Sequence, residues 1–375
     1  MTPPAGLDDA SPGSILRIRK APGDLTAAVA NSSAAYNILY RTTDSRYQPS
    51  WAVATLFVPA TPASSSALLS YQIAYDEVDV NKSPSYTLYT GSEQPDIEWA
   101  LGRGWHVVTG DYEGPLASFT AGVVSGHAVL DGVRAVLSSD CKDVLQFSDN
   151  VKYALWGYSG GALASEWATE LHVQYAPELS FSGAALGGLT PNVTAMIGLL
   201  DNTISASLIP GWLLGVTSQF PDAREYLVDA LKKEGPYNAT TFLGFANSTS
   251  SAVTFVNQEM GNYFVDGLAA LDAPVIKRVT YSDGIMGYHG VPQMSVYAYK
   301  AIHDELSVGA DTDKLIERYC EVGANIFYQR NTVGDHGGEF KAGSPRARAW
   351  LVSVLEGSHS EDGCRIETIT DPAPE

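Results

Sequence analysis

VKYALWGYSGGALASEWATEL, residues 151–171, contains the pattern from which the architecture of this chain follows. The run from Val151 to Trp156 is apolar and rich in residues that favour strands, and the Ala- and Leu-rich sequence after it has helical spacing. Between them, Gly157-Tyr158-Ser159-Gly160-Gly161 fits the pattern G-x-S-x-G. In a nucleophile elbow of this kind, the glycines let strand and helix approach closely, and the serine stands on a strained turn.

Two interpretations of this turn are open. It can serve packing alone, as a Gly-rich connection between a strand and a helix, or it can present Ser159 as a nucleophile. The flanking strand and helix favour the second interpretation. The first backbone N–H groups of such a helix are unpaired and lie where an oxyanion would form. We therefore take Ser159 as a candidate nucleophile.

Strand and helix patterns alternate on both sides of this segment. Strands are expected at 15–20, 51–59, 67–76, 105–112 and 179–188. The segments 51–59 and 67–76, separated by the polar turn ATPASSS, are expected to pair with each other. Helices are expected to end at Gly102 or Gly104 and to span 118–139. This alternation is typical of βαβ units and predicts an α/β fold with a mostly parallel central sheet.

Residues 191–290 break the alternation. Their pattern is mostly helical, and strand patterns return only with MSVYAYKAI (294–302), followed by the helix pattern TDKLIERYCEVG, a strand at 325–331 and a last helix at SPRARAWLVSVLEG. We therefore expect a core made of residues 1–190 and 291–375. The segment 191–290 is expected to be a helical cap or lid inserted over the strand ends.

The composition limits the classes of function. The chain has 375 residues and is 45% hydrophobic, which is ample for a large core. Its formal net charge of -19 argues against binding nucleic acid or an anionic membrane surface, because the long-range field repels both. The sequence has no run of 18 uninterrupted apolar residues, so no segment is expected to span a bilayer.

The sequence carries signs of secretion. Five asparagines begin N-x-S/T sequons, which are Asn31, Asn81, Asn192, Asn238 and Asn247. The start MTPPAGLDDASPG has neither a basic region nor an apolar region of the kind found in a signal peptide. We therefore expect a mature, glycosylated extracellular form from which the leader has been removed. Coincidence in a Ser- and Thr-rich chain is the alternative.

Three cysteines, Cys141, Cys320 and Cys364, are too few and too scattered for a metal site or a disulfide framework. One bridge is expected between Cys320 and Cys364, which would close a loop around the C-terminal region and leave Cys141 free. Three buried thiols are the alternative.

A serine nucleophile needs a base, and the base needs an orienting carboxylate. In α/β-hydrolases these groups follow the order Ser, acid, His, so the candidate bases are those after Ser159, namely His172, His289, His303, His336 and His359. We favour His336, which lies in the Gly-flanked loop TVGDHGGEF directly after a predicted strand.

The same order places the acid at the end of the preceding strand. Asp304, in YKAIHDELS, meets this requirement, and Glu305 is the second choice. Asp283 falls in the expected cap, and Asp335 is too close in sequence to fold back onto His336. Ser159, Asp304 and His336 are therefore the predicted catalytic residues.

Several blocks of the chain together resemble the fungal secretory lipases of the lipase A type. From about residue 50 to the last helix, the matching blocks are SYQIAYD with PSYTLYTG, GDYEGPLASFTAG with AVLDGVRAV, WGYSGGALASEWA with YAPELSFSGAALGGLTPNV, VYAYKAIHDELS with YCEVGANIFY, and GDHGGEFKAGSPRARAWL. The resemblance implies an α/β-hydrolase fold with a large helical cap. It also implies the same three catalytic residues, with an oxyanion hole formed by the backbone N–H of Gly160 and a contribution from Asp76. We give Asp111 and Glu113 a structural role only.

The resemblance implies a serine hydrolase that cleaves carboxylic esters through an acyl-enzyme, with no metal and no organic cofactor. Its substrate is expected to be a lipid ester or a small-molecule ester such as an acylated fungal metabolite, with transient contact with a lipid interface and no stable membrane insertion. The cap sequence matches the family poorly, and the segment HDELSVGADT lacks a Pro that many relatives carry. The resemblance therefore leaves the identity of the substrate open. An acyltransferase using the same triad and a catalytically inactive binding protein are the alternatives.

Overall fold

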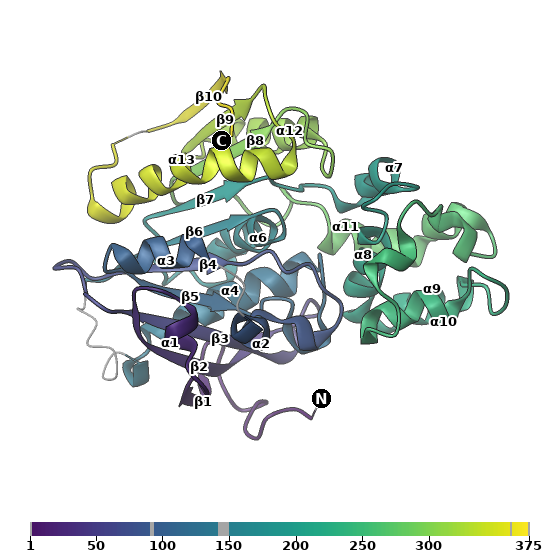
Figure 1. Cartoon of the computed structure of the whole chain (residues 1–375), viewed down its shortest axis with the longest axis horizontal. Helices are drawn as coiled ribbons and strands as arrows, with labels where there is room; N and C mark the ends of the chain where they lie inside the picture. Colours follow the sequence, from purple (N-terminus) through teal and green to yellow (C-terminus); the bar gives the residue numbers. More distant parts are fainter. Residues whose placement is uncertain (1, 91–93, 142–149, 361, 374–375) are drawn as a thin grey trace.

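The computed structural model describes residues 2–90, 94–141, 150–360 and 362–373. Its strands are β1 (Ile15–Lys20), β2 (Ser32–Thr43), β3 (Pro49–Pro59), β4 (Ala67–Gln72), β5 (His106–Gly110), β6 (Lys152–Tyr158), β7 (Gly183–Gly187), β8 (Val296–Ala301), β9 (Ile326–Asn331) and β10 (Cys364–Ile369). They form one sheet in the order β1-β2-β3-β5-β4-β6-β7-β8-β9-β10 (Figure 1). The pairs among β1, β2, β3 and β5 are antiparallel, and all later pairs are parallel. The predicted α/β fold with a mostly parallel sheet is confirmed.

The centre of the sheet determines where a site can form. Every residue of β4, β7 and β8 is buried, as expected for parallel strands that are covered on both faces. From β4 the chain crosses to β5 on one side, whereas from β6 it crosses to β7 on the other side. Because these connections diverge, the carboxyl ends of β4 and β6 border a crevice, which is where open α/β sheets bind ligands.

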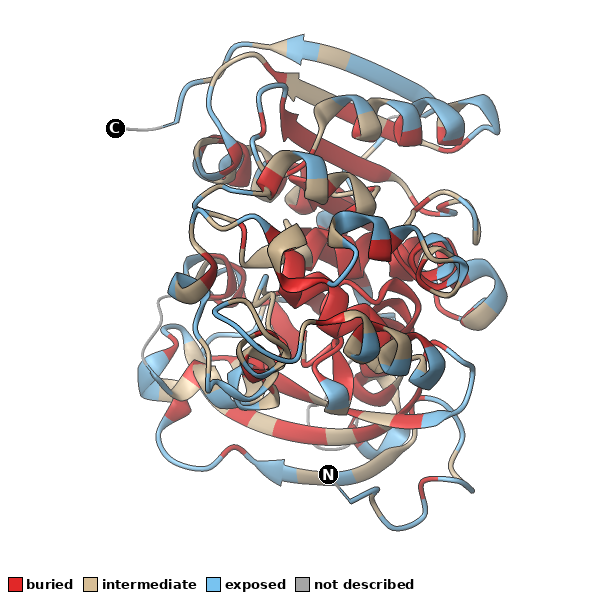
Figure 2. Cartoon of the chain, turned by 90° about the vertical axis from the view of Figure 1, so that its right-hand side faces the viewer, coloured by how far each residue is buried: buried red, intermediate tan, exposed pale blue. Residues whose placement is uncertain are grey.

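Helices cover both faces of the sheet. The helices around the core are α1 (Leu25–Ala28), α2 (Pro84–Thr87), α3 (Pro95–Gly102), α4 (Gly122–Leu137), α6 (Gly160–Tyr175), α12 (Gly309–Glu321) and α13 (His336–Glu356). Apolar side chains of α4, α6 and α12 share one buried cluster, and those of α3 and α13 share the cluster on the other face. Figure 2 shows the buried residues gathered in the middle of the molecule.

The connection between β7 and β8 is built from helices. They are α7 (Met196–Leu200), α8 (Leu208–Ser218), α9 (Pro221–Ala230), α10 (Ala239–Gly244) and α11 (Pro274–Asp283), with 3-10 turns η4 (Val193–Ala195), η5 (Phe245–Asn247), η6 (Ala252–Phe255), η7 (Met260–Tyr263) and η8 (Gly267–Asp272). Figure 1 shows these elements grouped beyond one end of the strands. Most of their buried apolar residues, such as Trp212 and Phe242, belong to the same cluster as α4 and α6, whereas Ala223, Ile276 and Val279 of α9 and α11 form a small cluster of their own. In the described part of the chain, no helix is both long and apolar enough to cross a membrane.

One pairing expected from the sequence is wrong. The segments 51–59 and 67–76 form β3 and β4, but these strands do not pair with each other, because β5 lies between them and pairs with both. The turn ATPASSS carries the chain past the position that β5 later fills. An antiparallel hairpin and such a split pair have similar local sequences, so the polar turn alone could not separate them.

Three further elements differ from expectation. The strands β2 and β10 were not predicted, and α13 begins at His336 instead of near residue 344. At the start of α13, the side chain of Asp335 accepts a hydrogen bond from the backbone N–H of Gly338 at 2.7 Å and so caps the helix. His336 is therefore the first residue of a helix and not part of a loop.

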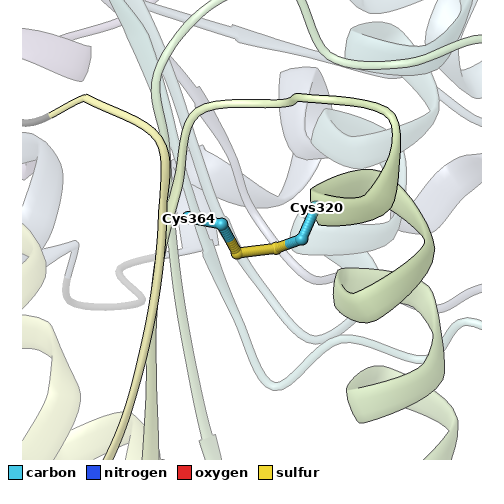
Figure 3. The surroundings of a disulfide bond; sticks show 2 residues. All are labelled: Cys320 and Cys364. Atoms are coloured by element: carbon cyan, nitrogen blue, oxygen red, sulfur yellow. A yellow bond between two sulfur atoms is a disulfide. The ribbon is translucent and has the colours of Figure 1, made fainter.

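The predicted disulfide is confirmed. Cys320 at the end of α12 is bonded to Cys364 at the start of β10, with a Cα–Cα distance of 5.6 Å, and Cys141 is free and buried (Figure 3). The bond fixes the last strand of the sheet, most of whose side chains are exposed, to a helix that packs on the core.

We expect the double variant Cys320→Ser/Cys364→Ser to lose about 4 kcal/mol of unfolding free energy, from the chain entropy of a loop closed over 44 residues. Urea denaturation with and without a reducing agent measures this loss. Cys141→Ser is the matched control, because it changes a thiol outside the bond. A double variant that is as stable as this control would show that the bond does not stabilise the fold.

Candidate active site

The turn between β6 and α6 places Ser159 at the crevice. Ser159 is half-buried and has φ 55° and ψ -123°, a backbone conformation that residues other than glycine rarely adopt. Its backbone N–H donates to the carbonyl of Gly187 at 2.9 Å, so the end of β7 fixes the turn. Such strain persists only where the surrounding structure fixes it, as it does in a nucleophile elbow.

The glycines on either side of Ser159 are required by close backbone contacts. A Cβ atom on Gly157 would lie 2.2 Å from the carbonyl carbon of Gly161. A Cβ atom on Gly161 would lie 2.0 Å from the carbonyl oxygen of Gln72, at the end of β4. Both contacts are far shorter than real Cβ atoms allow, so strand, helix and neighbouring strand can meet here only with glycine at these positions.

Asp304 and His336 meet above the ends of β8 and β9. The Nδ1 atom of His336 lies 2.7 Å from Oδ2 of Asp304, and both residues are buried. The other carboxylate oxygen of Asp304 accepts the backbone N–H groups of Leu306 at 2.9 Å and Ser307 at 3.0 Å. The carboxylate is thereby held in one orientation toward the imidazole, which is the arrangement that fixes the tautomer of a catalytic histidine.

A buried lysine supports this carboxylate. Lys300, whose side chain is 1% exposed, donates from Nζ to Oδ2 of Asp304 at 2.8 Å and to the carbonyl of Leu189 at 2.9 Å. Burial raises the pKa of Asp304, but the hydrogen bond from His336 and the charge of Lys300 outweigh it and lower this pKa to about 2. Asp304 is therefore ionised at any pH at which the protein would work.

The backbone of His336 is held from two further sides. The hydroxyl of Tyr158 donates to the backbone carbonyl of His336 at 2.6 Å, and the two rings lie 5.1 Å apart. The backbone N–H of His336 donates to Oε2 of Glu305 at 2.8 Å. Because Tyr158 precedes Ser159, these contacts bring the imidazole to the nucleophile turn. Among the described residues no hydrogen bond joins Ser159 to His336; such contacts commonly tighten when substrate binds.

Asp76 lies across the crevice, after β4. Its backbone is left-handed, with φ 48°, and a Cβ atom on Gly160 would lie 1.9 Å from its Oδ1. That oxygen is buried and, within the described residues, has no hydrogen-bond partner. Burial raises the pKa of Asp76 to about 6, and the nearby His336 opposes the shift. Below that pH its carboxyl is neutral and can donate a hydrogen bond.

Two tyrosines hold the chain just before Asp76. The hydroxyl of Tyr112 donates to the carbonyl of Ile73 at 2.8 Å, and the backbone N–H of Glu113 donates to the hydroxyl of Tyr75 at 2.8 Å. The two rings lie 4.8 Å apart. The turn after β5 thus fixes the turn after β4, and it also binds α2, because Asp111 accepts the Ser85 N–H at 2.8 Å.

One cavity adjoins Ser159, and a larger one shares part of its wall. The inner cavity has a volume of about 40 Å³ and is lined by Ser159, Gly160, Leu163, Thr190 and Met196 among others. The outer cavity has a volume of about 440 Å³, and Asp76, Phe119 and Leu208 line both cavities. Residues from the helical segment, such as Met196 and Leu208, therefore form part of the wall around the nucleophile turn.

The structure brings the predicted catalytic residues to one edge of the sheet, with Asp76 and Gly160 beside them. Glu305, the second choice for the acid, contacts the backbone of His336 and not its ring. Of the other histidines, His172 contacts the carbonyl of Leu179, far along α6 from Ser159. Lys300 was not among the residues predicted from the sequence. Its signal is a lysine within VYAYKA, an otherwise uncharged strand pattern, where a buried cation requires a partner.

The chain is similar to known proteins of one family. The family model "Secretory lipase" matches residues 80–363. The chain is 47% identical to the trichothecene C-3 esterase of Fusarium sporotrichioides over 98% of this chain and 86% of that protein. It is 34% identical to lipase A of Arthroderma benhamiae over 98% of this chain and 81% of that protein.

A solved structure of a lipase has a similar fold. Candida antarctica lipase A superposes with a TM-score of 0.86 at 27% identity, covering 99% of this chain and 88% of that one. The family match spans most of the chain and includes the segments that carry Ser159, Asp304 and His336. The chain therefore belongs to the secretory lipase family, and it is a carboxylic ester hydrolase.

Proposed function

We propose that Ser159, Asp304 and His336 act as a catalytic triad. His336 takes the proton of the Ser159 hydroxyl as that oxygen attacks the ester carbonyl, and it then gives the proton to the leaving alcohol. Water then attacks the acyl-enzyme as His336 takes its proton, and His336 returns this proton to Oγ of Ser159 as the acid leaves. Asp304 holds His336 in the required tautomer and stabilises its charged form. The hydrogen bond of 2.7 Å between Asp304 and His336 is the observation that carries this proposal.

The proposed oxyanion hole consists of the backbone N–H of Gly160 and Asp76. Gly160 is the first residue of α6, so its N–H is free of an intrahelical partner. The close approach of the Asp76 carboxyl to Gly160 supports a joint role, and the pKa of Asp76, raised to about 6, supports a carboxyl that is neutral below that pH and then donates to the oxyanion. Donors fixed in this way stabilise the transition state more than the substrate.

We propose further that residues 191–290 form a cap that limits access to Ser159, because residues of this segment line both cavities. The outer cavity is lined by polar as well as apolar groups, including Glu77, Lys82 and Ser207. A long alkyl chain would desolvate the two charged side chains without replacing their hydrogen bonds. The substrate that fits best is an ester of a short acid with a small-molecule alcohol. The similarity to the trichothecene C-3 esterase of Fusarium supports an acylated fungal metabolite as the substrate.

We expect kcat/KM for p-nitrophenyl acetate to exceed that for p-nitrophenyl palmitate by about 10²-fold. The small cavity at Ser159 fits a short acyl group, and each tenfold preference corresponds to about 1.4 kcal/mol. Both substrates are measured in the same non-ionic detergent, so that aggregation does not decide the ratio. A higher kcat/KM for palmitate would instead support a triacylglycerol lipase.

An extracellular location is supported by the family to which the chain belongs and by its five sequons. The disulfide between Cys320 and Cys364 is in line with this, because such bonds persist in oxidising compartments. We propose that the chain functions after secretion, where esters reach it from the medium.

A further inference from the structure

The five sequons differ in the exposure and the hydrogen bonds of their asparagine side chains. An N-linked oligosaccharide needs an amide nitrogen that faces solvent and surroundings that leave room for the first sugar. The structure allows each sequon to be compared on the exposure of its residues and on the hydrogen bonds of the asparagine.

Three of the amide nitrogens are bonded to the protein itself. Nδ2 of Asn31 donates to the carbonyl of Glu98 at 3.0 Å, and Nδ2 of Asn81 donates to Oδ1 of Asp79 at 3.0 Å. Nδ2 of Asn238 donates to the carbonyl of Gly235 at 2.6 Å. These bonds hold each side chain against the protein surface and use one of the two hydrogens of each amide nitrogen, so a sugar has only the other hydrogen to replace and less room around it.

The two remaining sequons share one local geometry. Oδ1 of Asn192 accepts the N–H of Thr194 at 3.1 Å and its hydroxyl at 2.6 Å. Oδ1 of Asn247 accepts the N–H of Thr249 at 3.2 Å and its hydroxyl at 2.7 Å. In both, the hydroxyl that defines the sequon is fixed on the asparagine. Neither amide nitrogen has a hydrogen-bond partner in the part of the chain that the structure describes.

Asn192 and Asn247 differ in how far their surroundings are buried. Asn192 is half-buried and forms a β-bridge with Ile285, and the next residue, Val193, is 1% exposed and donates to the carbonyl of Gly284 at 3.1 Å. Asn247, in contrast, is exposed together with Ser248 and Thr249. We propose that Asn247 is the principal site of N-linked glycosylation.

Glycosylation transfers an oligosaccharide from a lipid carrier to the amide nitrogen of Asn247. The donor is a lipid-linked oligosaccharide pyrophosphate, which the secretory pathway supplies. The bond between the first sugar carbon and the pyrophosphate oxygen breaks as the bond from that carbon to Nδ2 of Asn247 forms. The amide loses one proton, and the lipid pyrophosphate leaves. The proposal therefore rests on the secretion proposed above and not on the triad.

The position of Asn247 gives the sugar a role at the site. Asn247 lines a cavity of about 560 Å³ beside the loop of Asp79. The next residue, Ser248, donates to Oδ2 of Asp79 at 2.5 Å and lines the outer cavity next to Asp76. An oligosaccharide at Asn247 is thus attached one residue from the lining of the outer cavity. We infer that a bulky glycan at this position hinders aggregated lipid more than it hinders dissolved esters.

The test uses the full chain secreted from a yeast host. The glycan is released by peptide N-glycosidase in heavy-oxygen water, and peptide mass spectrometry locates the labelled aspartate. We expect the label at position 247 at higher occupancy than at any other sequon. Asn247→Gln and Thr249→Ala should each remove it, whereas Asn192→Gln, which has the same local geometry, should leave the glycan pattern unchanged. An unlabelled Asn247, with or without label elsewhere, overturns the proposal.

The role at the rim is tested separately. Asn247→Gln should hydrolyse dissolved p-nitrophenyl acetate at the rate of the unaltered protein and should gain activity several-fold on an emulsified ester. Enzymatic removal of the glycan from the folded protein should have the same effect. Equal activity on the emulsion in all forms would reject the screening role. Because glycan mapping does not depend on hydrolysis, it distinguishes a wrong site from a wrong catalytic assignment.

Discussion

Replacing Ser159 by alanine is expected to lower the turnover of p-nitrophenyl acetate by about 10³- to 10⁶-fold, with little change in folding stability. The hydroxyl forms the acyl-enzyme, and no other group can take its place at the elbow. The residual rate of such variants comes from substrate binding and the oxyanion hole. The removed oxygen forms no hydrogen bond to His336 in the described structure, so its loss breaks no contact on which the fold depends.

The control for this variant is Ser207→Ala. Ser207 is also half-buried and lines the outer cavity, but it lies at the start of α8 and away from the elbow. We expect its activity to stay within a few-fold of the unaltered protein. Labelling with a fluorophosphonate probe, followed by peptide mapping, reports the nucleophile directly. A Ser159→Ala protein that keeps a tenth of the activity, or labelling at another serine, would contradict the proposed triad.

The centre of the fold could be predicted from the sequence because its signals are local. At Gly157 the pattern changes from a strand run to helical spacing within a few residues, and only a tight strand-to-helix turn accommodates that change. Asp304 and His336 could be chosen because each follows a strand pattern in the required order. Their hydrogen bond joins residues far apart in sequence, so a local pattern cannot predict it. The resemblance to a family suggested this pairing, and the structure contains it.

The elements that were missed depend on such distant contacts. The strand β10 has mostly exposed side chains and forms by pairing with β9 beside the disulfide, so its own sequence lacks an apolar pattern. The start of α13 was placed too late because Gly337 and Gly338 disfavour a helix, and the cap by Asp335 offsets this. Lys300 is buried because Asp304 is its partner, which a strand pattern alone does not show.

Asp304 orients His336, so its replacement is also expected to lower activity strongly. We expect Asp304→Asn to lower kcat by about 10⁴-fold, because an amide can present N–H groups to Nδ1 of His336 and favour the wrong tautomer. This loss corresponds to about 5 kcal/mol of transition-state stabilisation. Glu305→Gln is the matched control, because Glu305 is the next residue and binds only the backbone N–H of His336. Its kcat should fall by less than about tenfold, in line with a lost hydrogen bond to the backbone.

Stability and catalysis must be separated for this variant, because Asp304→Asn also leaves the buried ammonium of Lys300 without its carboxylate. An unpaired buried charge costs about 3–5 kcal/mol, so the single variant is expected to unfold at a lower urea concentration. In the double variant Lys300→Met/Asp304→Asn the charge is removed, and most of the stability should return while kcat stays low. If the double variant regained activity together with stability, the role of Asp304 would be to hold the fold. If Glu305→Gln proved the more damaging single change, the orienting carboxylate would be Glu305, and the hydrogen bond of 2.7 Å between Asp304 and His336 would not be the one that catalysis uses.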